Sequence, residues 1–202
     1  MKFVAFNGPP GCGKDHIATR VMAATDPSLS PIIVKFAKPL KEMVHAAHGL
    51  TDYDGLPLPH HYFETSKDEP QQCLNGRTMR EAYKRMSEHY VKPMLGERYF
   101  GEKLAKQFNW TIGMDKVVLC SDSGFAHELA PVIEDGHDVY VVRIHRTGCD
   151  FSNDTRAYLN RGMIQAALRH SSKISNVRFL SLHNDGDLNI PELLTCLMIK
   201  EN

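Results

Sequence analysis

A glycine-rich loop near the start of the chain carries the residues best suited to chemistry. Residues 3–18 read FVAFNGPPGCGKDHIA and fit the spacing G-x-x-x-x-G-K. Glycines let backbone N–H groups converge on phosphate oxygens, and the lysine adds a cation for the same oxygens. The apolar run before the loop and the helical pattern after it are the context that a phosphate-binding loop requires. The residues expected to contact a nucleotide here are Gly8, Gly11, Cys12, Gly13, Lys14, Asp15 and His16.

Two aspartates are the candidate metal ligands. Asp15 stands where such loops usually have Ser or Thr as a ligand for Mg²⁺. A carboxylate is also a hard oxygen ligand, and beside phosphates it is repelled unless a cation lies between them. Asp122 directly follows the apolar run 117–121, where a second acid for the metal is expected. The alternative role for Asp122 is to cap the helix expected from residue 125.

Three arginines accompany the apolar run 138–143 and the polar stretch after it: Arg143, Arg146 and Arg156. Phosphoryl transfer needs cations on the migrating phosphate, and the planar guanidinium matches phosphate oxygens. The alternative for each is an ordinary solvated arginine. We expect at least one of them to act on phosphate, and the catalytic candidates are Lys14, Asp122 and Arg146.

The elements that would position these residues can be read from the pattern of apolar residues. Short, nearly continuous apolar runs predict strands buried on both faces of a parallel sheet. These runs are 2–7, 32–36, 117–121, 138–143 and 177–183. Helical patterns lie between them at 14–24, 38–48, 78–91, 97–108, 125–134 and 190–200, with a break near Pro93. This alternation predicts an α/β fold with a five-stranded parallel sheet flanked by helices.

Two irregular stretches interrupt this alternation. Residues 50–77 form a long connection, which is usually functional or disordered in a compact domain. Residues 144–156 follow the fourth expected strand, at the edge where open α/β sheets bind ligands.

Composition narrows the class of protein. A chain of 202 residues with 42% hydrophobic residues is long and apolar enough for one domain with a real core. Its net charge of +0 argues mildly against a protein that coats nucleic acid. Its apolar runs are far shorter than the ~20 residues of a membrane span, and no signal peptide precedes the loop, so we expect a cytoplasmic location. The five cysteines lack a C-x-x-C pair, which favours reduced thiols over a zinc site.

Several short segments along the chain form a recognisable set, and they follow one another in a characteristic order. They are GKD at 13–15, FAKPLKE at 36–42, SDSGFAHE at 121–128, SNDTR at 152–156 and NDGDL at 184–188. This set resembles the bacteriophage deoxynucleoside monophosphate kinase family, a branch of the P-loop nucleoside monophosphate kinases, in which an aspartate after the loop lysine is typical. The resemblance implies a single three-layer P-loop kinase domain over 1–202, with ATP as the donor and Mg²⁺ as the metal ion. It also implies a lid over about 144–160, with Arg143, Arg146 and Arg156 as its arginines, and it puts Asn184 and Asp185 near the donor adenine.

The resemblance further implies an acceptor-binding insertion over about 50–110. The acceptor-side candidates are Lys38, Lys41, Arg80, Lys84 and Glu128, with Arg85 on the same expected helix as Arg80. The alternative for the cations is a solvated amphipathic face. The aromatic residues of this region are expected in the core or the cleft wall, and one of them stacking on the acceptor base is the alternative: Tyr83, Tyr90, Tyr99, Phe100 and Trp110.

Two positions depart from the family pattern. Gly124 stands where members often carry an arginine shortly after the strand-end aspartate, and His16 replaces a common threonine. Both departures bear on the identity of the acceptor.

Three functions remain open at this point. The first is a deoxynucleoside monophosphate kinase that makes diphosphates. The second is a kinase for the hydroxymethyl group of 5-hydroxymethyluracil in phage DNA, in which Asp122 or Glu128 would serve as the base. The third is a P-loop ATPase or switch without an acceptor. The expected partners are therefore a small nucleotide or modified DNA, with no membrane. The expected state is a monomer or homodimer, in the host cytoplasm if the protein is phage-encoded.

Overall fold

The computed structural model describes residues 1–108, 115–152, 154–186 and 188–201. It forms two compact units, which we call the sheet unit (Met1–Phe36 with Gly101–Asn202) and the helical unit (Ala37–Phe100). The expected insertion over about 50–110 overlaps the helical unit, which begins earlier and ends at Phe100. Trp110 lies outside the described residues, so its expected place in the core or cleft wall stays a prediction.

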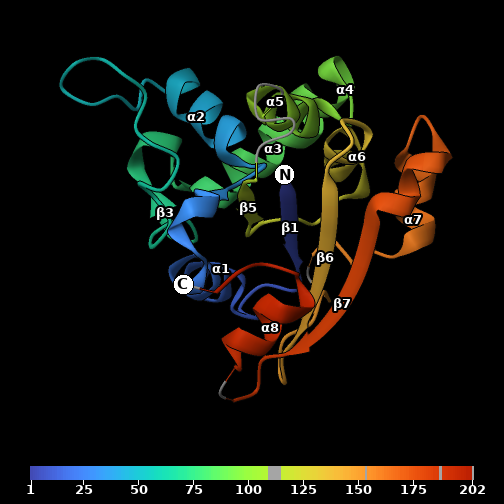
Figure 1. The fold of residues 1–202 in the computed structure, drawn as a ribbon. Helices are drawn as coiled ribbons and strands as arrows, with labels where there is room; N and C mark the ends of the chain where they lie inside the picture. The colour runs from blue at the N-terminus through green and yellow to red at the C-terminus, as the bar shows by residue number, and fades with distance from the viewer. Residues whose placement is uncertain (109–114, 153, 187, 202) are drawn as a thin grey trace. The chain divides into compact units, whose positions relative to one another are not determined.

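A five-stranded parallel sheet organises the sheet unit (Figure 1). Its order is β2 (Ile32–Val34), β5 (Val117–Cys120), β1 (Lys2–Asn7), β6 (Asp138–His145) and β7 (Val177–His183). Every neighbouring pair runs parallel. The predicted α/β fold and all five predicted strands are confirmed, although β2 and β5 end earlier than expected and β6 runs two residues further.

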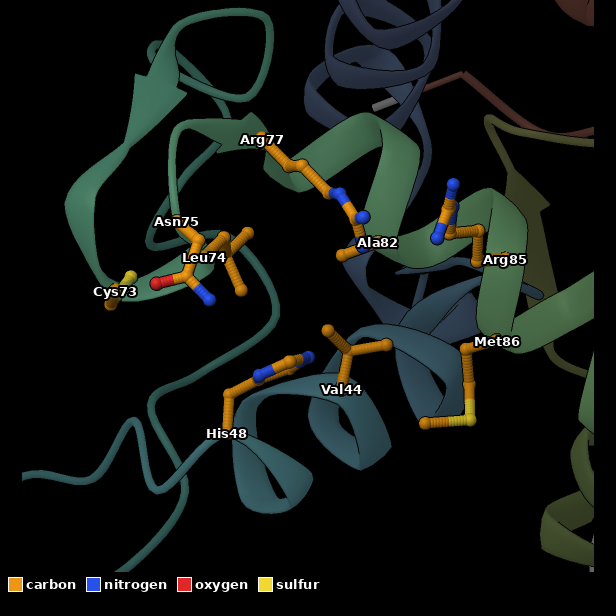
Figure 2. A pocket seen from close by; sticks show the side chains of 9 residues that line it. All are labelled: Val44, His48, Cys73, Leu74, Asn75, Arg77, Ala82, Arg85 and Met86. Atoms are coloured by element: carbon orange, nitrogen blue, oxygen red, sulfur yellow. The ribbon is translucent and has the colours of Figure 1, made fainter.

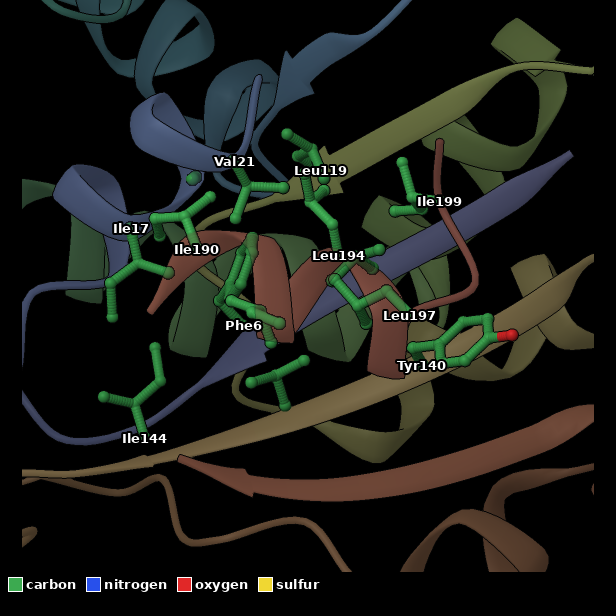
Figure 3. Packing of buried hydrophobic residues seen from close by; sticks show 14 of the residues in the cluster. Phe6, Ile17, Val21, Leu119, Tyr140, Ile144, Ile190, Leu194, Leu197 and Ile199 are labelled. Atoms are coloured by element: carbon green, nitrogen blue, oxygen red, sulfur yellow. The ribbon is translucent and has the colours of Figure 1, made fainter. Parts of the chain in front are cut away.

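Helices flank both faces of this sheet. On one face α1 (Lys14–Ala24) and α8 (Ile190–Cys196) join alternate strand residues in a single buried cluster, drawn in Figure 3. Phe6, Leu119 and Ile144 in that cluster are fully buried. Burial of each such side chain contributes about 1.5–3 kcal/mol, so the cluster holds α1 firmly against the strand that precedes it.

The other face is covered by α6 (Ala126–Glu134) and α7 (Arg161–Ala167). The guanidinium of Arg161 in α7 lies 5.9 Å from the ring centre of Phe179, which is paired with Val141 in the sheet. The predicted helices at 14–24, 125–134 and 190–200 are present, the second starting one residue later and the third ending at Cys196, whereas α7 was not predicted. No helix among the described residues is long and apolar enough to cross a membrane.

The helical unit is built on α2 (Lys38–Ala47) and α3 (Met79–Met86). Thr78 and Glu81 form a capping box that starts α3. The predicted helical pair is present, but the break between its two members falls at Gly96, three residues after Pro93. The helix continues as a π-helical turn (Ser87–Val91) and then α4 (Lys92–Leu95), and it ends at Gly96. A π-helical turn shifts the hydrogen-bond register just before the proline, so the chain passes Pro93 without ending the helix.

The long connection 50–77 belongs to this unit and carries several turns and a short hairpin of β3 (Pro70–Gln71) and β4 (Arg77–Thr78). Of the aromatic residues expected in the core or the cleft wall, Tyr83 and Phe100 are buried, whereas Tyr90 is 54% exposed. The last helix of the region, α5 (Tyr99–Phe108), begins in the helical unit and continues into the sheet unit.

Close packing between α5 and α6 gives the first prediction. A Cβ atom on Gly101 would lie 2.0 Å from the Glu128 carbonyl oxygen, so Gly101→Ala must push the two helices apart. We expect a loss of about 1–3 kcal/mol in the free energy of unfolding, measured by urea denaturation. In the matched variant Gly162→Ala, in α7, the nearest atom is 3.4 Å away, so this variant should be neutral or slightly more stable. Equal stability of the two variants would contradict the described packing.

Candidate phosphate-binding site

The loop between β1 and α1 has the backbone that its glycines predict. Gly11 and Gly13 adopt positive φ angles of +77° and +95°, which side-chain-bearing residues rarely tolerate. Lys14 begins α1, and its ammonium donates to the carbonyl oxygens of Gly8 and Pro9, each at 2.7 Å. The ammonium therefore lies over the loop itself, beside the positive end of the helix.

Charge at the loop favours a bound anion. Burial lowers the pKa of Lys14, and the positive charge of Arg156 acts in the same direction. A polyanion at this position would stabilise the charged form of both side chains. His16 lies exposed on α1, whereas Cys12, a residue of the loop itself, is fully buried.

The ends of β6 and β7 fix the shape of the loop. A Cβ on Gly8 would lie 2.8 Å from the Ile144 carbonyl oxygen, and a Cβ on Gly13 would lie 2.4 Å from Nδ2 of Asn184. That same amide donates to the Cys12 carbonyl oxygen at 2.8 Å. The structure thus brings together three residues that the sequence placed around the donor: Gly8, Gly13 and Asn184.

Arg146 and Asp185 also belong to this neighbourhood. Arg146 donates from its guanidinium to the Gly11 carbonyl oxygen at 3.0 Å. The Asp185 carboxylate accepts a hydrogen bond from the Thr147 amide at 2.6 Å, which lowers the pKa of Asp185. The segment after β6 is therefore tied to both the loop and the segment after β7.

Arg143 does not lie in the expected lid. The strand β6 extends to His145, so Arg143 is a strand residue, and its guanidinium lies 5.7 Å from the ring centre of Phe179. Successive strand residues point to opposite faces, and Arg143 falls on the face that α7 covers. The sequence prediction ended the strand two residues too early.

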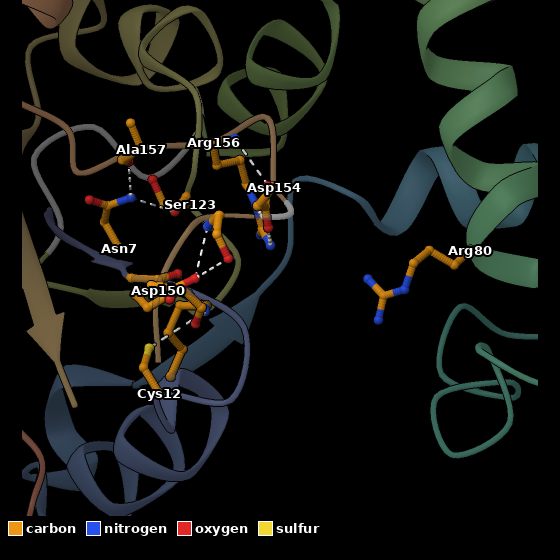
Figure 4. Close-up of polar contacts among 12 residues, drawn as sticks. Asn7, Cys12, Arg80, Ser123, Asp150, Asp154, Arg156 and Ala157 are labelled. Carbon is orange, nitrogen blue, oxygen red and sulfur yellow. Dashed lines mark hydrogen bonds and ion pairs between the residues drawn. The ribbon is translucent and has the colours of Figure 1, made fainter. Parts of the chain in front are cut away.

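Arg156 lies against the end of β5. A Cβ on Gly124 would be 2.2 Å from the Arg156 Cδ, so the aliphatic part of Arg156 fills the space that a side chain at position 124 would need. Arg156 forms a two-pronged pair with Asp154, visible in Figure 4, and this pair raises the pKa of Arg156. The carboxylates of Asp122 and Glu128 also favour its charge. An arginine from a later segment therefore occupies the place left by the glycine.

The two predicted metal ligands lie at the carboxyl end of β5. The Asp15 carboxylate accepts from the Ser121 hydroxyl at 2.7 Å and pairs with the Lys35 ammonium at 2.8 Å. The Asp122 carboxylate accepts from the Phe36 amide at 2.9 Å and does not cap α6, whose N-cap is Phe125. The alternative capping role for Asp122 is therefore wrong.

The oxygens at this site are of the kind that magnesium prefers. Asp15, Asp122 and the Ser121 hydroxyl offer hard oxygen ligands at one strand end. In the part of the chain that the structure describes, no group of three or more His, Cys, Asp or Glu could hold a metal ion. Mg²⁺ is commonly held by one or two carboxylates together with substrate phosphates, so this donor set suits an ion that arrives with a nucleotide.

Three residues of the site were missed in the sequence. Asn7 is fully buried, and it donates to the Ser123 and Ala157 carbonyl oxygens and accepts from the Leu159 amide (Figure 4). It thereby joins the end of β1 to the segments that carry Asp122 and Arg156. Ser121 and Lys35 are the others. The sequence features that could have identified these residues are a polar residue at the end of the runs 2–7 and 117–121 and a lysine inside the run 32–36.

The expected acceptor-side residues lie in different settings. Lys41 pairs with Glu64, which also pairs with Lys67 at 2.8 Å. Arg80 forms a two-pronged pair with Asp68, and Lys38 lies 4.0 Å from Glu42. The pairs made by Lys41 and Arg80 fasten the connection 50–77 to α2 and α3, whereas the Lys38–Glu42 pair lies within α2. Lys84 is exposed on α3, and Glu128 is buried on α6 in the sheet unit.

Comparison with known proteins does not assign this chain to a family. No protein-family model matches the chain, and no curated protein sequence matches it. The resemblance to phage monophosphate kinases therefore stays a prediction.

The Lys41–Glu64 pair predicts a dependence of stability on pH. Burial alone would raise the pKa of Glu64, but Lys41 and Lys67 outweigh burial and lower the pKa of Glu64 from 4.5 to about 2. The stabilisation is therefore fully present above pH 4.5 and is lost as the pH falls toward 2. We expect Lys41→Met to destabilise the protein at pH 6 and to do so less at pH 3, as measured by urea unfolding.

A matched variant controls for the loss of a lysine. Lys38→Met removes an exposed partner at 4.0 Å and should change stability little at either pH. A destabilisation by Lys41→Met that is the same at pH 6 and pH 3 would contradict this account of Glu64.

Proposed function

We propose that this protein is a kinase that transfers a phosphoryl group from ATP, with Mg²⁺, to a deoxynucleotide. The observation that carries the proposal is the loop of residues 8–14. This loop combines positive-φ glycines, the N-terminus of α1 and the Lys14 ammonium, which donates to the loop carbonyls of Gly8 and Pro9. That combination is an anion site suited to the β- and γ-phosphates of a nucleotide.

Catalysis would consist mainly of positioning and charge neutralisation. Phosphoryl transfer passes through a transition state with charge spread over the migrating group, so cations aimed at that group lower the barrier. Lys14 would neutralise the phosphates from the loop. Arg146, held to the Gly11 carbonyl, and Arg156, held by Asp154, would approach from the segments after β6.

Asp15 and Asp122 would hold Mg²⁺, which when bound supplies positive charge to the phosphate oxygens. Ser121 orients Asp15 by its hydrogen bond, and the Phe36 amide orients Asp122. Lys35 offers a cation to Asp15, which lowers the repulsion between this carboxylate and nearby phosphates.

A deoxynucleoside monophosphate is the acceptor we favour, in agreement with the sequence resemblance. Its phosphate oxygen is already anionic and needs no general base. Neither the buried position of Glu128 nor the hydrogen bond that Asp122 makes to Phe36 favours a role as base for a hydroxyl acceptor.

The proposal is tested by ADP release from ATP and Mg²⁺. The acceptors are each deoxynucleoside monophosphate, 5-hydroxymethyl-deoxyuridine monophosphate, plain DNA and DNA containing 5-hydroxymethyluracil. We expect a monophosphate to stimulate ADP release. Lys14→Ala should lower kcat/KM by about a hundredfold or more, because one preorganised cation is lost. Lys106→Ala, which removes an exposed lysine of α5, should leave kcat/KM unchanged.

The other outcomes separate the competing functions. Stimulation by modified DNA alone would show a hydroxyl acceptor in place of a phosphate. ADP release that ignores every acceptor would indicate an ATPase or switch. No ADP release under any condition would contradict phosphoryl transfer from ATP.

A further inference from the structure

A basic stretch of the chain builds the β7 edge of the sheet. Residues 155–183 contain four arginines and one lysine, but no aspartate or glutamate. They run through α7 and a 3₁₀ helix (Ser171–Asn176) into β7, which is the last strand in the sheet order (Figure 1). The whole chain has a net charge of +0, so acids elsewhere in the chain balance this local excess of positive charge. A local excess of positive charge attracts polyanions.

One face of β6 and β7 presents cationic and ring side chains together. In the parallel pairing, Arg143 lies beside Ser181, and His145 lies beside His183. Alternate strand residues point to the same face, so these side chains share with Phe179 the face on which α7 lies. Ser181 and His183 are exposed and the other three are half-buried, so this part of the sheet is open to solvent. We call these five residues the β6–β7 face.

A connected series of rings crosses the β6–β7 face. The rings of His145 and His183 are stacked, with their centres 5.2 Å apart. The ring centre of Tyr158 lies 4.4 Å from that of His145, and Phe151 meets Tyr158 edge-on at 5.0 Å. His183 ends the series and is exposed. Exposed flat rings are platforms on which the bases of a single nucleic-acid strand stack.

Two guanidinium groups lie over another ring of the same face. Those of Arg143 and Arg161 are 5.7 and 5.9 Å from the ring centre of Phe179. In the part of the chain that the structure describes, the buried Nε of Arg143 has no hydrogen-bond partner. Arg161 is exposed, and its hydrogen bonds to the carbonyl oxygens of Ile174 and Val177 are long, each at 3.4 Å. Both guanidinium groups therefore keep donors for phosphate oxygens.

The acids of this part of the chain have other partners. Between residues 139 and 183 the sequence has two of them, Asp150 and Asp154. Asp154 forms its two-pronged pair with Arg156, and Asp150 accepts hydrogen bonds from the amide and the hydroxyl of Ser152. The positive charge of the β6–β7 face is therefore left for a ligand.

We propose that the β6–β7 face binds single-stranded nucleic acid, with phosphates on Arg143 and Arg161 and a base stacked on His183. The strand from Phe179 to His183 spans about 13 Å, which is room for a few nucleotides. A single strand fits better than a duplex because its bases are free to stack on side-chain rings. No modified base is required, since every base has a flat face. The face shares no residue with the loop of residues 8–14, so the proposal does not rest on the proposed kinase activity.

The test is fluorescence anisotropy of a labelled oligothymidylate of about 12 nucleotides, titrated with the intact protein without ATP. We expect saturable binding, with an association constant that falls as salt rises, at a logarithmic slope of about −1.4 for two phosphate contacts. Unlabelled duplex DNA should compete less well than the unlabelled single strand. Oligouridylate as competitor separates the two sources of a single strand: equal competition assigns the face to DNA and RNA alike, and weaker competition assigns it to DNA.

Variants of the face test each kind of contact. Arg161→Ala should weaken binding about tenfold and make the salt slope shallower by about 0.7, because one phosphate contact is lost. His183→Ala should weaken binding about fivefold or more through lost stacking. His183→Phe, which keeps a flat ring, should bind as the wild-type protein does.

A matched arginine of the helical unit controls for the loss of charge. Arg77 is exposed and lines a pocket between α2 and α3, beside Val44 and Met86 (Figure 2). Arg77→Ala should leave binding of the oligonucleotide unchanged.

Three results would overturn the proposal: no saturable binding, competition by duplex DNA as strong as that by the single strand, or equal affinity in Arg161→Ala and Arg77→Ala. Lys14→Ala should bind the oligonucleotide as tightly as the wild-type protein while ADP release from ATP is lost. Failure of the β6–β7 face and failure of the proposed kinase activity are therefore distinguishable. Loss of oligonucleotide binding in Lys14→Ala would put the strand at the loop and would also overturn the proposal.

Discussion

The site depends on how closely the loop of residues 8–14 approaches the ends of β6 and β7. Gly8 lies under the Ile144 carbonyl and Gly13 under the Asn184 amide, so neither position has space for a Cβ. Asn184 and Arg146 then bind the carbonyl oxygens of Cys12 and Gly11. The loop is therefore shaped by the sheet as much as by its own glycines, and side chains from outside the loop bind two of its carbonyls while α1 presents its N-terminus.

The same sheet edge gathers the charges of the site. Parallel strands end together, and the acids after β5 and the arginines after β6 lie near the loop for this reason. Asn7 joins the segments that carry Asp122 and Arg156 with three hydrogen bonds. Oppositely charged side chains of the site form ion pairs: Lys35 pairs with Asp15, and Asp154 pairs with Arg156. These ion pairs hold the charged side chains of the site in place within the protein itself.

Much of the sheet and of the glycine-rich loop could be predicted from the sequence because both depend on local residue patterns. Fully buried strands give continuous apolar runs, and the G-x-x-x-x-G-K spacing specifies its own turn, so the sheet and the loop were predicted well. Contacts between segments that are distant in sequence were not predicted. Nothing local to Gly124 reveals that Arg156 fills its space, and nothing local to Lys41 or Arg80 reveals their partners Glu64 and Asp68. The π-helical turn before Pro93 was missed because propensity alone predicts a break there.

The central claim is that residues 8–14 bind the phosphates of a nucleotide, and its most direct test is equilibrium binding of ATP with Mg²⁺ by isothermal titration calorimetry. We expect the wild-type protein to bind ATP and Lys14→Ala to weaken binding by about tenfold or more, because a charged hydrogen-bond partner of the phosphates is lost. Failure of the wild-type protein to bind ATP, or equal affinity in Lys14→Ala, would contradict it.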